Sequence, residues 1–192
     1  MALDELFDQL ADALDGDTAI EATGRAALRD ARSRINPAAT PSPLQPSILA
    51  VMAAPDAHPV CAQVANEPLP WGPPQTSSDP RYVAVSTTKA HVELVGPDGL
   101  ARADDVRIGL YGMVPNAEYG ARTHPAEEVF VMLAGAADWA RGDAPYAGHT
   151  PGARSWHPSM LPHATRTRAS AFLSLYIWQG DVSTDNYVYR GG

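Results

Sequence analysis

Cysteine and lysine are almost absent from this chain of 192 residues, which contains one of each, Cys61 and Lys89. A lone cysteine excludes an intramolecular disulfide and a zinc site built from cysteines. With 14 basic and 22 acidic residues the net charge is −8. No cluster of Lys and Arg forms the basic face that a general nucleic-acid binder needs to displace counterions from phosphates. Nucleic acid and anionic membrane surfaces are therefore not expected as partners.

Long apolar runs are also missing from the sequence. None approaches the roughly 20 residues that a helix needs to span a bilayer. The first residues are acidic, with Asp4, Glu5 and Asp8, and they lack the basic start of a signal peptide. No membrane association is expected, and a cytoplasmic location is the default expectation.

The first part of the chain, residues 1–80, is expected to be a helical and proline-rich extension. Apolar residues recur at helical spacing from Leu3 to Leu14, and a second helix is expected from Ile20 to Arg34. From there to residue 80, 11 of the 18 prolines exclude a long helix or a central strand. Only short helices or edge strands fit Ser47–Ala54 and Val60–Ala65. We interpret the helices as a packing or dimerisation extension.

The second part, residues 81–192, is expected to be a β-barrel domain. Short runs of alternating or β-branched residues are separated by Gly and Pro turn signals, with no helical pattern between them. This arrangement is typical of a sandwich or barrel. The expected strands are Tyr82–Thr87, His91–Val95, Val106–Val114, Glu128–Ala134, Arg154–His157 and Phe172–Trp178.

Chemically active side chains gather in the segment from Tyr119 to Gly135. Alternate residues of an extended strand share a face. If the backbone is regular here, Arg122, His124, Glu128 and Phe130 point together into the barrel. A histidine and a carboxylate on one face are ligands within reach of a single metal ion.

A second segment, Thr150–Ala164, runs through prolines into a turn that presents His163. A barrel would bring this segment against the first one. His163, His124 and Glu128 then form a two-His, one-carboxylate set, which leaves coordination positions open for water or substrate. The expected cofactor is one divalent transition metal ion, Zn, Fe or Mn, whose identity these ligand types do not decide.

Each of these histidines also has a simpler interpretation. His124 and His163 would serve equally as hydrogen-bonded core residues, although their paired motifs favour metal ligation. His157 is expected to be structural or to lie beside the ligands rather than to be a fourth one. His91 is expected at the surface.

These motifs resemble those of a known family. The pattern His124-Pro-Ala-Glu-Glu128, six residues and Gly135, followed by His157-Pro-x-x-x-Pro-His163-Ala, resembles the two metal motifs of a cupin. It is similar to the cupin-type dimethylsulfoniopropionate (DMSP) lyases, most closely the DddQ type, over roughly residues 105–180. The resemblance implies a mainly β fold, with a single double-stranded β-helix or jelly-roll barrel and an N-terminal helical extension. It also implies His124, Glu128 and His163 as the metal ligands and, by analogy, suggests a homodimer.

Two positions depart from the family pattern His-x-His-x-x-x-Glu-x-Tyr. Arg122 stands at the first His and Phe130 at the Tyr. The family tyrosine is thought to serve as a base or metal-linked residue, and a phenyl ring has no ionisable or coordinating atom with which to replace it. Tyr119 matches another family tyrosine and becomes the candidate catalytic residue.

The reaction implied by the resemblance is a β-elimination that cleaves DMSP to acrylate and dimethyl sulfide. The metal would polarise the carboxylate of this small zwitterionic substrate, and a tyrosine would take the α-proton. To act as a base, Tyr119 needs its pKa depressed by the metal or by a cation such as Arg122. Candidate substrate-binding residues, including an aromatic wall for the sulfonium, are Arg122, Phe130, Trp178 and Tyr111, with Tyr176 and Trp156 as further wall candidates.

Three alternatives stay open at this point. In the first alternative, the barrel is a metalloenzyme that acts on another small carboxylate, for example an Fe-dependent oxygenase. In the second, the barrel binds a small anion without catalysis, and Arg122 holds that anion. In the third, the protein is a lyase in which Arg122 or Phe130 is an engineered substitution that traps the substrate.

Overall fold

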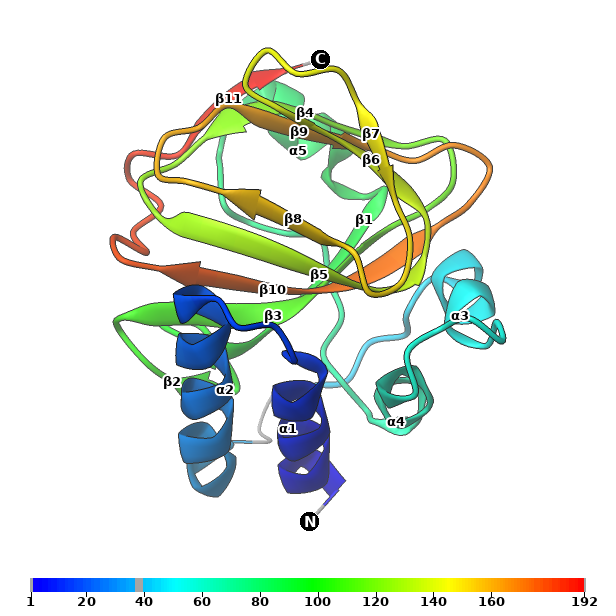
Figure 1. Cartoon of the computed structure of the whole chain (residues 1–192), viewed down its shortest axis with the longest axis vertical. Helices are drawn as coiled ribbons and strands as arrows, with labels where there is room; N and C mark the ends of the chain where they lie inside the picture. Colours follow the sequence, from blue (N-terminus) through cyan, green and yellow to red (C-terminus); the bar gives the residue numbers. More distant parts are fainter. Residues whose placement is uncertain (1, 37–39, 192) are drawn as a thin grey trace.

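Two facing β-sheets form one end of the molecule, in the upper part of Figure 1, and helices α1 to α4 lie at the other end. The computed structural model describes residues 2–36 and 40–191. One sheet has six strands in the order β2-β1-β3-β10-β5-β8, and the other has five in the order β11-β4-β9-β6-β7. The helices come first along the chain and the strands follow. The prediction of a mainly β cupin barrel with an N-terminal helical extension is confirmed.

The helices all lie in the first 86 residues, and the strands begin at Lys89. The helices are α1 Ala2–Ala13, α2 Ala19–Ala31, the 3-10 helix η1 Arg32–Arg34, α3 Pro46–Met52, α4 Val60–Asn66 and α5 Pro80–Ser86. The strands are β1 Lys89–Gly96, β2 Ala101–Arg102, β3 Val106–Met113, β4 Glu118–Thr123, β5 Glu127–Gly135, β6 Ala137–Arg141, β7 Ala147–His149, β8 Arg154–His157, β9 His163–Arg166, β10 Phe172–Gln179 and β11 Val188–Gly191.

Helices α2 to α4 pack on one face of the six-stranded sheet, and α1 packs against α2 and α4 (Figure 1). The start of α2 is secured by a reciprocal cap, in which the Thr18 hydroxyl accepts from the Glu21 amide and donates to the Glu21 carboxylate. The first of these bonds satisfies an amide that the first turn of a helix leaves unpaired, and the second orients the capping hydroxyl. The predicted helices before residue 36 are thus present, and the two proline-bounded segments form α3 and α4. None of the helices within the described ranges has the length and apolar character that crossing a bilayer requires.

The first predicted strand, Tyr82–Thr87, is wrong, because these residues belong to helix α5. Its N-cap residue, Asp79, accepts a hydrogen bond from the Arg81 amide, and Pro80 occupies the first helical turn. Proline fits there because its fixed φ suits a helix and its missing N–H would be unpaired anyway. The capping signal outweighs the β-branched residues that follow.

The three central strands β3, β5 and β10 send alternate side chains to opposite faces. On β5, Val129 and Val131 pack on the helix-covered side, whereas Phe130 and Met132 face the interior between the sheets. A turn after β5 depends on Gly135, whose φ is +69°; a Cβ there would lie 2.0 Å from the Ala171 carbonyl oxygen. Glycine alone tolerates both conditions. The alternation therefore creates two separate cores, one outside and one inside the barrel.

Candidate metal centre

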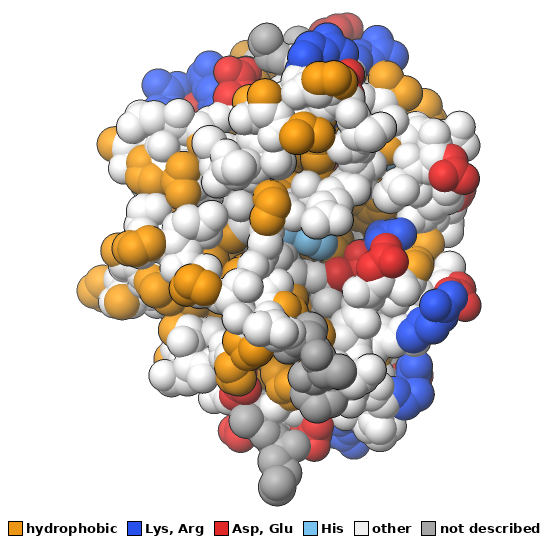
Figure 2. All heavy atoms as spheres, turned by 180° about the vertical axis from the view of Figure 1, so that it is seen from behind, with side chains coloured by type: hydrophobic (Ala, Val, Ile, Leu, Met, Phe, Trp, Pro, Cys, Tyr) orange, Lys and Arg blue, Asp and Glu red, His pale blue; other side chains and the backbone are white. Residues whose placement is uncertain are grey.

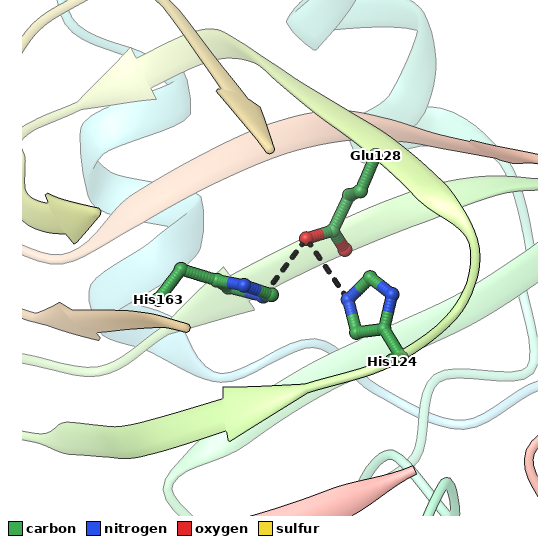
Figure 3. A group of neighbouring side chains, drawn as sticks. All are labelled: His124, Glu128 and His163. Carbon is green, nitrogen blue, oxygen red and sulfur yellow. Dashed lines mark ion pairs between the residues drawn. The ribbon is translucent and has the colours of Figure 1, made fainter. Parts of the chain in front are cut away.

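A regular backbone through the first motif would form one continuous strand, but the structure has two strands there. Strand β4, which ends at Thr123, belongs to the five-stranded sheet, and β5, which begins at Glu127, belongs to the six-stranded sheet. The chain therefore changes sheets at His124-Pro125-Ala126. The side chains of His124 and Glu128 still converge, because they come from the two walls of one barrel corner (Figure 3).

His163 reaches the same point from strand β9. Its Cα is paired across the sheet with that of Arg122, so the second motif lies beside the first, as expected for a barrel. The Glu128 Oε2 atom is 3.1 Å from His163 Nε2 and 3.5 Å from His124 Nε2 (Figure 3). One potential ligand atom from each residue lies within 4.8 Å of the others, and all three side chains are buried.

The protonation of the two imidazoles suits a metal ion. His124 Nδ1 donates to the Ala126 carbonyl at 3.0 Å and His163 Nδ1 donates to the Leu161 carbonyl at 2.8 Å. In a neutral imidazole a proton on Nδ1 leaves the lone pair on Nε2, and within the described parts of the chain neither buried Nε2 has a hydrogen-bond partner. Burial, followed by the charge of Arg122, lowers the pKa of His163 to about 3. Two lone pairs and a carboxylate oxygen thus face one point, an arrangement that a cation satisfies and a proton network does not.

Neighbouring side chains hold the Glu128 carboxylate in place. The Trp178 indole N–H donates to Oε1, and His157 Nδ1 donates to Oε2 at 2.9 Å. His157 is held in turn by the Ser155 hydroxyl at 2.9 Å from Nε2. Burial raises the pKa of Glu128, but the hydrogen bond from His157 opposes this and helps to hold that pKa well below its usual range. His157 therefore contacts the carboxylate, and Trp178 supports it while stacking on His124 at 4.1 Å between ring centroids.

Arg122 is a buried cation close to these ligands. Its guanidinium lies 3.8 Å above the centre of the Tyr119 ring. Its hydrogen bonds to the Tyr119 carbonyl and the Thr165 hydroxyl are both long, at 3.4 Å. The ammonium group of Lys89 also lies over the Tyr119 ring, 4.8 Å from its centre. Neither group has a carboxylate partner among the described residues, although the Lys89 ammonium donates to the Val85 carbonyl. Arg122, together with Lys89 when it is protonated, therefore forms an environment that attracts an anion.

Tyr119, the candidate catalytic residue, is buried and its hydroxyl is hydrogen-bonded to that of Tyr187. Burial raises its pKa well above the ordinary value, and Arg122 offsets this only in part. Among the described side chains, Arg122 does not bring the pKa of Tyr119 below its ordinary value.

A cavity of about 580 Å³ connects this region to the surface. The face seen in Figure 2 is hollowed near its middle, where a histidine side chain is visible. The predicted site residues that line the cavity are Tyr111, Tyr119, Arg122, Glu128, Phe130, Tyr176 and Trp178. Trp156 does not: it is 46% exposed, and its indole N–H donates to Glu127. Trp156 is excluded from the aromatic wall because β8, at the edge of its sheet, turns this side chain outward.

Three residues near the cavity were not predicted to be part of the site: His91, Lys89 and Tyr187. His91 was expected at the surface; it is half-buried at the side of the cavity, and its Nε2 lies 2.8 Å from the Tyr176 hydroxyl. Lys89 and Tyr187 were not identified as part of the site at all. The alternation of side chains along β1 could have revealed Lys89 and His91. Ala90 and Val92 pack on the helix-covered side, so Lys89 and His91 face the interior.

Comparisons with known proteins agree on one family. A family model described as dimethylsulfoniopropionate lyase matches residues 54–174. The dimethylsulfoniopropionate lyase DddQ of Ruegeria pomeroyi is 36% identical over 91 residues, which are 47% of this chain and 45% of that protein. The aligned segment thus spans less than half the length of this curated relative.

Solved structures extend the likeness over the whole chain. The crystal structure of DMSP lyase DddQ from Ruegeria pomeroyi matches with a TM-score of 0.71 and 26% identity, covering 100% of this chain and 98% of that one. A chain from the crystal structures of the DMSP lyases RdDddP and RnDddQII matches with a TM-score of 0.70 and 23% identity, covering 97% and 96%. At 23% identity the second likeness supports the fold alone.

Proposed function

The chain belongs to the dimethylsulfoniopropionate lyase family, and from this premise we propose that it cleaves DMSP to acrylate and dimethyl sulfide by a metal-dependent β-elimination. One observation carries the proposal: a convergent His124, Glu128 and His163 set and a buried, weakly bonded Arg122 lie beside one cavity. A metal site next to an anion site is what a substrate with a carboxylate beside its acidic proton requires.

The carboxylate of the substrate is placed at the inner end of the cavity. Arg122 offers guanidinium N–H donors that are not used by any carboxylate among the described residues. A divalent metal ion held by His124, Glu128 and His163 would supply Lewis-acid polarisation of that carboxylate, which makes the α-proton easier to remove. His157 and Trp178 keep the Glu128 carboxylate ionised and oriented through their hydrogen bonds.

The sulfonium end is placed against aromatic rings. Tyr111, Phe130 and Trp178 line the cavity, and the Tyr111 and Phe130 ring centres are 5.7 Å apart. Aromatic faces attract cations, by roughly 0.5 to 2 kcal/mol for each contact. The attraction is lost when the sulfonium becomes a neutral sulfide, which favours release of the product. Phe130, which lacks a hydroxyl, serves in this role as a wall.

The base is a phenol of the cavity wall. The sequence points to Tyr119, which stays a candidate. Its hydroxyl, however, is bonded to a second phenol, Tyr187, and burial raises the pKa of both groups. A pair of phenols contains no group that readily takes up a proton at neutral pH. Tyr119 and Arg122 together are better suited to binding the carboxylate.

Release of dimethyl sulfide into the headspace is the direct test. We expect purified protein, reloaded separately with Fe(II), Mn(II) and Zn(II), to release it from DMSP well above metal-free protein. Protein that demonstrably holds metal but releases none would contradict the lyase proposal. Oxygen consumption with other small carboxylates would then favour an oxygenase, and anion binding without turnover would favour a binding role. Recovery of release in Phe130→Tyr would show that this position alone had removed the activity.

A further inference from the structure

Three tyrosines whose rings line the cavity differ in what their hydroxyls contact. The buried hydroxyl of Tyr111 has no hydrogen-bond partner within the described ranges, and that of Tyr119 meets another phenol. The hydroxyl of Tyr176 lies 2.8 Å from Nε2 of His91, and both of these residues line the cavity. Of the three tyrosines, Tyr176 is therefore the one whose hydroxyl contacts a group able to take up its proton.

A glycine makes this contact between distant strands feasible. Tyr176 on β10 is paired with Gly109 on β3, and His91 lies on β1, one strand further. A Cβ at Gly109 would lie 2.8 Å from the Tyr176 ring and 2.9 Å from its hydroxyl. The phenol thus crosses β3 through the space that the missing side chain leaves. The two rings then stack, with centroids 5.5 Å apart at 29°.

Tyr176 lies beside Phe130, the residue that stands at the position of the missing family tyrosine. Tyr176 is the cross-strand partner of Phe130, and their ring centres are 6.1 Å apart. Two residues further along β10, Trp178 donates to the metal-ligand candidate Glu128. Tyr176 and His91 line the same cavity as Arg122 and Glu128, so the Tyr176 hydroxyl and its imidazole partner share one cavity with the proposed carboxylate site.

A backbone bridge fixes His91 at the side of the cavity. The His91 amide donates to the Gly72 carbonyl at 2.7 Å, and the Gly72 amide donates back at 3.0 Å. The proline-rich loop around Gly72 itself lines the cavity. Burial, followed by the charge of Arg107, lowers the pKa of His91 to about 4, and burial raises the pKa of Tyr176 well above its usual value. At neutral pH the imidazole is therefore neutral and the phenol holds its proton.

We propose that Tyr176, with His91 as its proton acceptor, is the catalytic base of this chain, in place of the phenol that Phe130 lacks. The inference rests on the proposed β-elimination. The Tyr176 oxygen takes the α-proton while its own proton passes to His91 Nε2. The C–H electron pair forms the Cα–Cβ double bond, the Cβ–S bond breaks, and its electron pair leaves on sulfur as neutral dimethyl sulfide. The imidazolium of His91 then releases its proton to water, so acrylate, dimethyl sulfide and one proton are formed.

The test compares three variants of the metal-loaded protein. Tyr176→Phe is expected to lower kcat for dimethyl sulfide release by about 100-fold or more, with KM little changed, since general-base catalysis contributes about 10²- to 10⁴-fold. His91→Gln retains a hydrogen-bond acceptor but not a proton acceptor. It is expected to lower kcat by about 10-fold or more and to raise the isotope effect on α-deuterated DMSP. Tyr189→Phe is the matched control, because Tyr189 is also buried but its hydroxyl accepts from the Gly120 amide outside the cavity lining.

An outcome in which Tyr176→Phe retains wild-type kcat overturns the assignment and leaves the lyase proposal standing. A wild-type protein that releases no dimethyl sulfide would instead remove the lyase proposal. Proton exchange then decides the assignment separately. Dimethylsulfonioacetate has acidic α-protons and cannot undergo β-elimination, so NMR in D₂O reports proton removal alone. Exchange catalysed by the wild type and lost in Tyr176→Phe supports the base, and no exchange above background overturns it.

Discussion

The two faces of the six-stranded sheet are built from the same strands but have opposite chemistry. The face that packs against α2 to α4 is aliphatic, and Leu173, Leu175 and Ile177 of β10 point into it. The face inside the barrel carries Tyr176 and Trp178 from the same strand, together with aromatic residues and buried charges from its neighbours. One residue of register along β10 separates the two environments.

The difference shows where stability and function reside in this molecule. The outer core depends on burial of apolar area, which is non-directional and tolerates changes of shape. The inner core holds Arg122 and Lys89 without a paired carboxylate among the described residues, and histidine lone pairs aimed at Glu128. Such groups lower stability until a ligand satisfies them. We therefore expect substitutions on the two faces to separate binding and catalysis from folding.

The largest difference in metal binding between two substitutions is expected at the adjacent residues Glu128 and Glu127. Glu128→Gln should remove metal binding and dimethyl sulfide release, because an amide is a poor metal ligand in place of a carboxylate. The loss of affinity should exceed the roughly 10- to 100-fold effect of changing an outer-shell partner. Glu127→Gln is the control, since Glu127 bonds to Trp156 and Gln179 on the other side of β5. Metal content after dialysis, measured for both variants, tests the comparison; equal metal content would refute the assigned ligand.

A truncation on the helix-covered face should have the reverse effect. Leu175 is fully buried in the outer core, so Leu175→Ala should lower the free energy of unfolding by about 2 to 5 kcal/mol. Metal binding should persist at temperatures where the variant is folded. Denaturant unfolding and metal content measured on one sample check both statements. A variant of unchanged stability that loses metal would show that the two cores are not independent.

The single lysine gives a pH-dependent contrast. Burial, followed by the charge of Arg122, lowers the pKa of Lys89 to about 7 in the folded state. The unfolded chain, with an ordinary lysine pKa of about 10.4, then binds more protons above pH 7, so stability rises with pH through this window. Lys89→Met removes the effect. The free energy of unfolding of Lys89→Met minus that of the wild type should therefore fall between pH 7 and pH 9, by at most about 3 kcal/mol. Denaturant unfolding at both pH values measures it, and a difference that stays constant would contradict it.

The smallest effect is expected outside both cores. Trp156→Phe changes an exposed ring that lies away from the cavity, so stability should stay within about 0.5 kcal/mol. The rate of dimethyl sulfide release should equal that of the wild type. A reduced rate would place Trp156 at the cavity after all and would remove the boundary drawn here between the interior and the edge of the barrel.

Some parts of the structure were predictable from local pattern and others were not. Strand Arg154–His157 agrees with its predicted bounds because alternation and flanking turns agree there. Tyr82–Thr87 was wrong because the cap formed by Asp79 and Pro80 outweighs β-branched content. The three ligand candidates follow from motif spacing and do converge. The sheet change at Pro125, in contrast, leaves no periodic trace in the sequence.

The amino-acid sequence by itself determined the barrel and its helical extension, the motif residues His124, Glu128 and His163, and the two departures at Arg122 and Phe130. These features depend on local periodicity, turn residues and motif spacing. The tertiary structure alone decided that Tyr176 meets His91, that Lys89 lies beside Tyr119, and that Trp156 faces away from the cavity. The physical reason is that strand order brings together residues 85 positions apart and Gly109 leaves the space between them, so no local pattern records their contact.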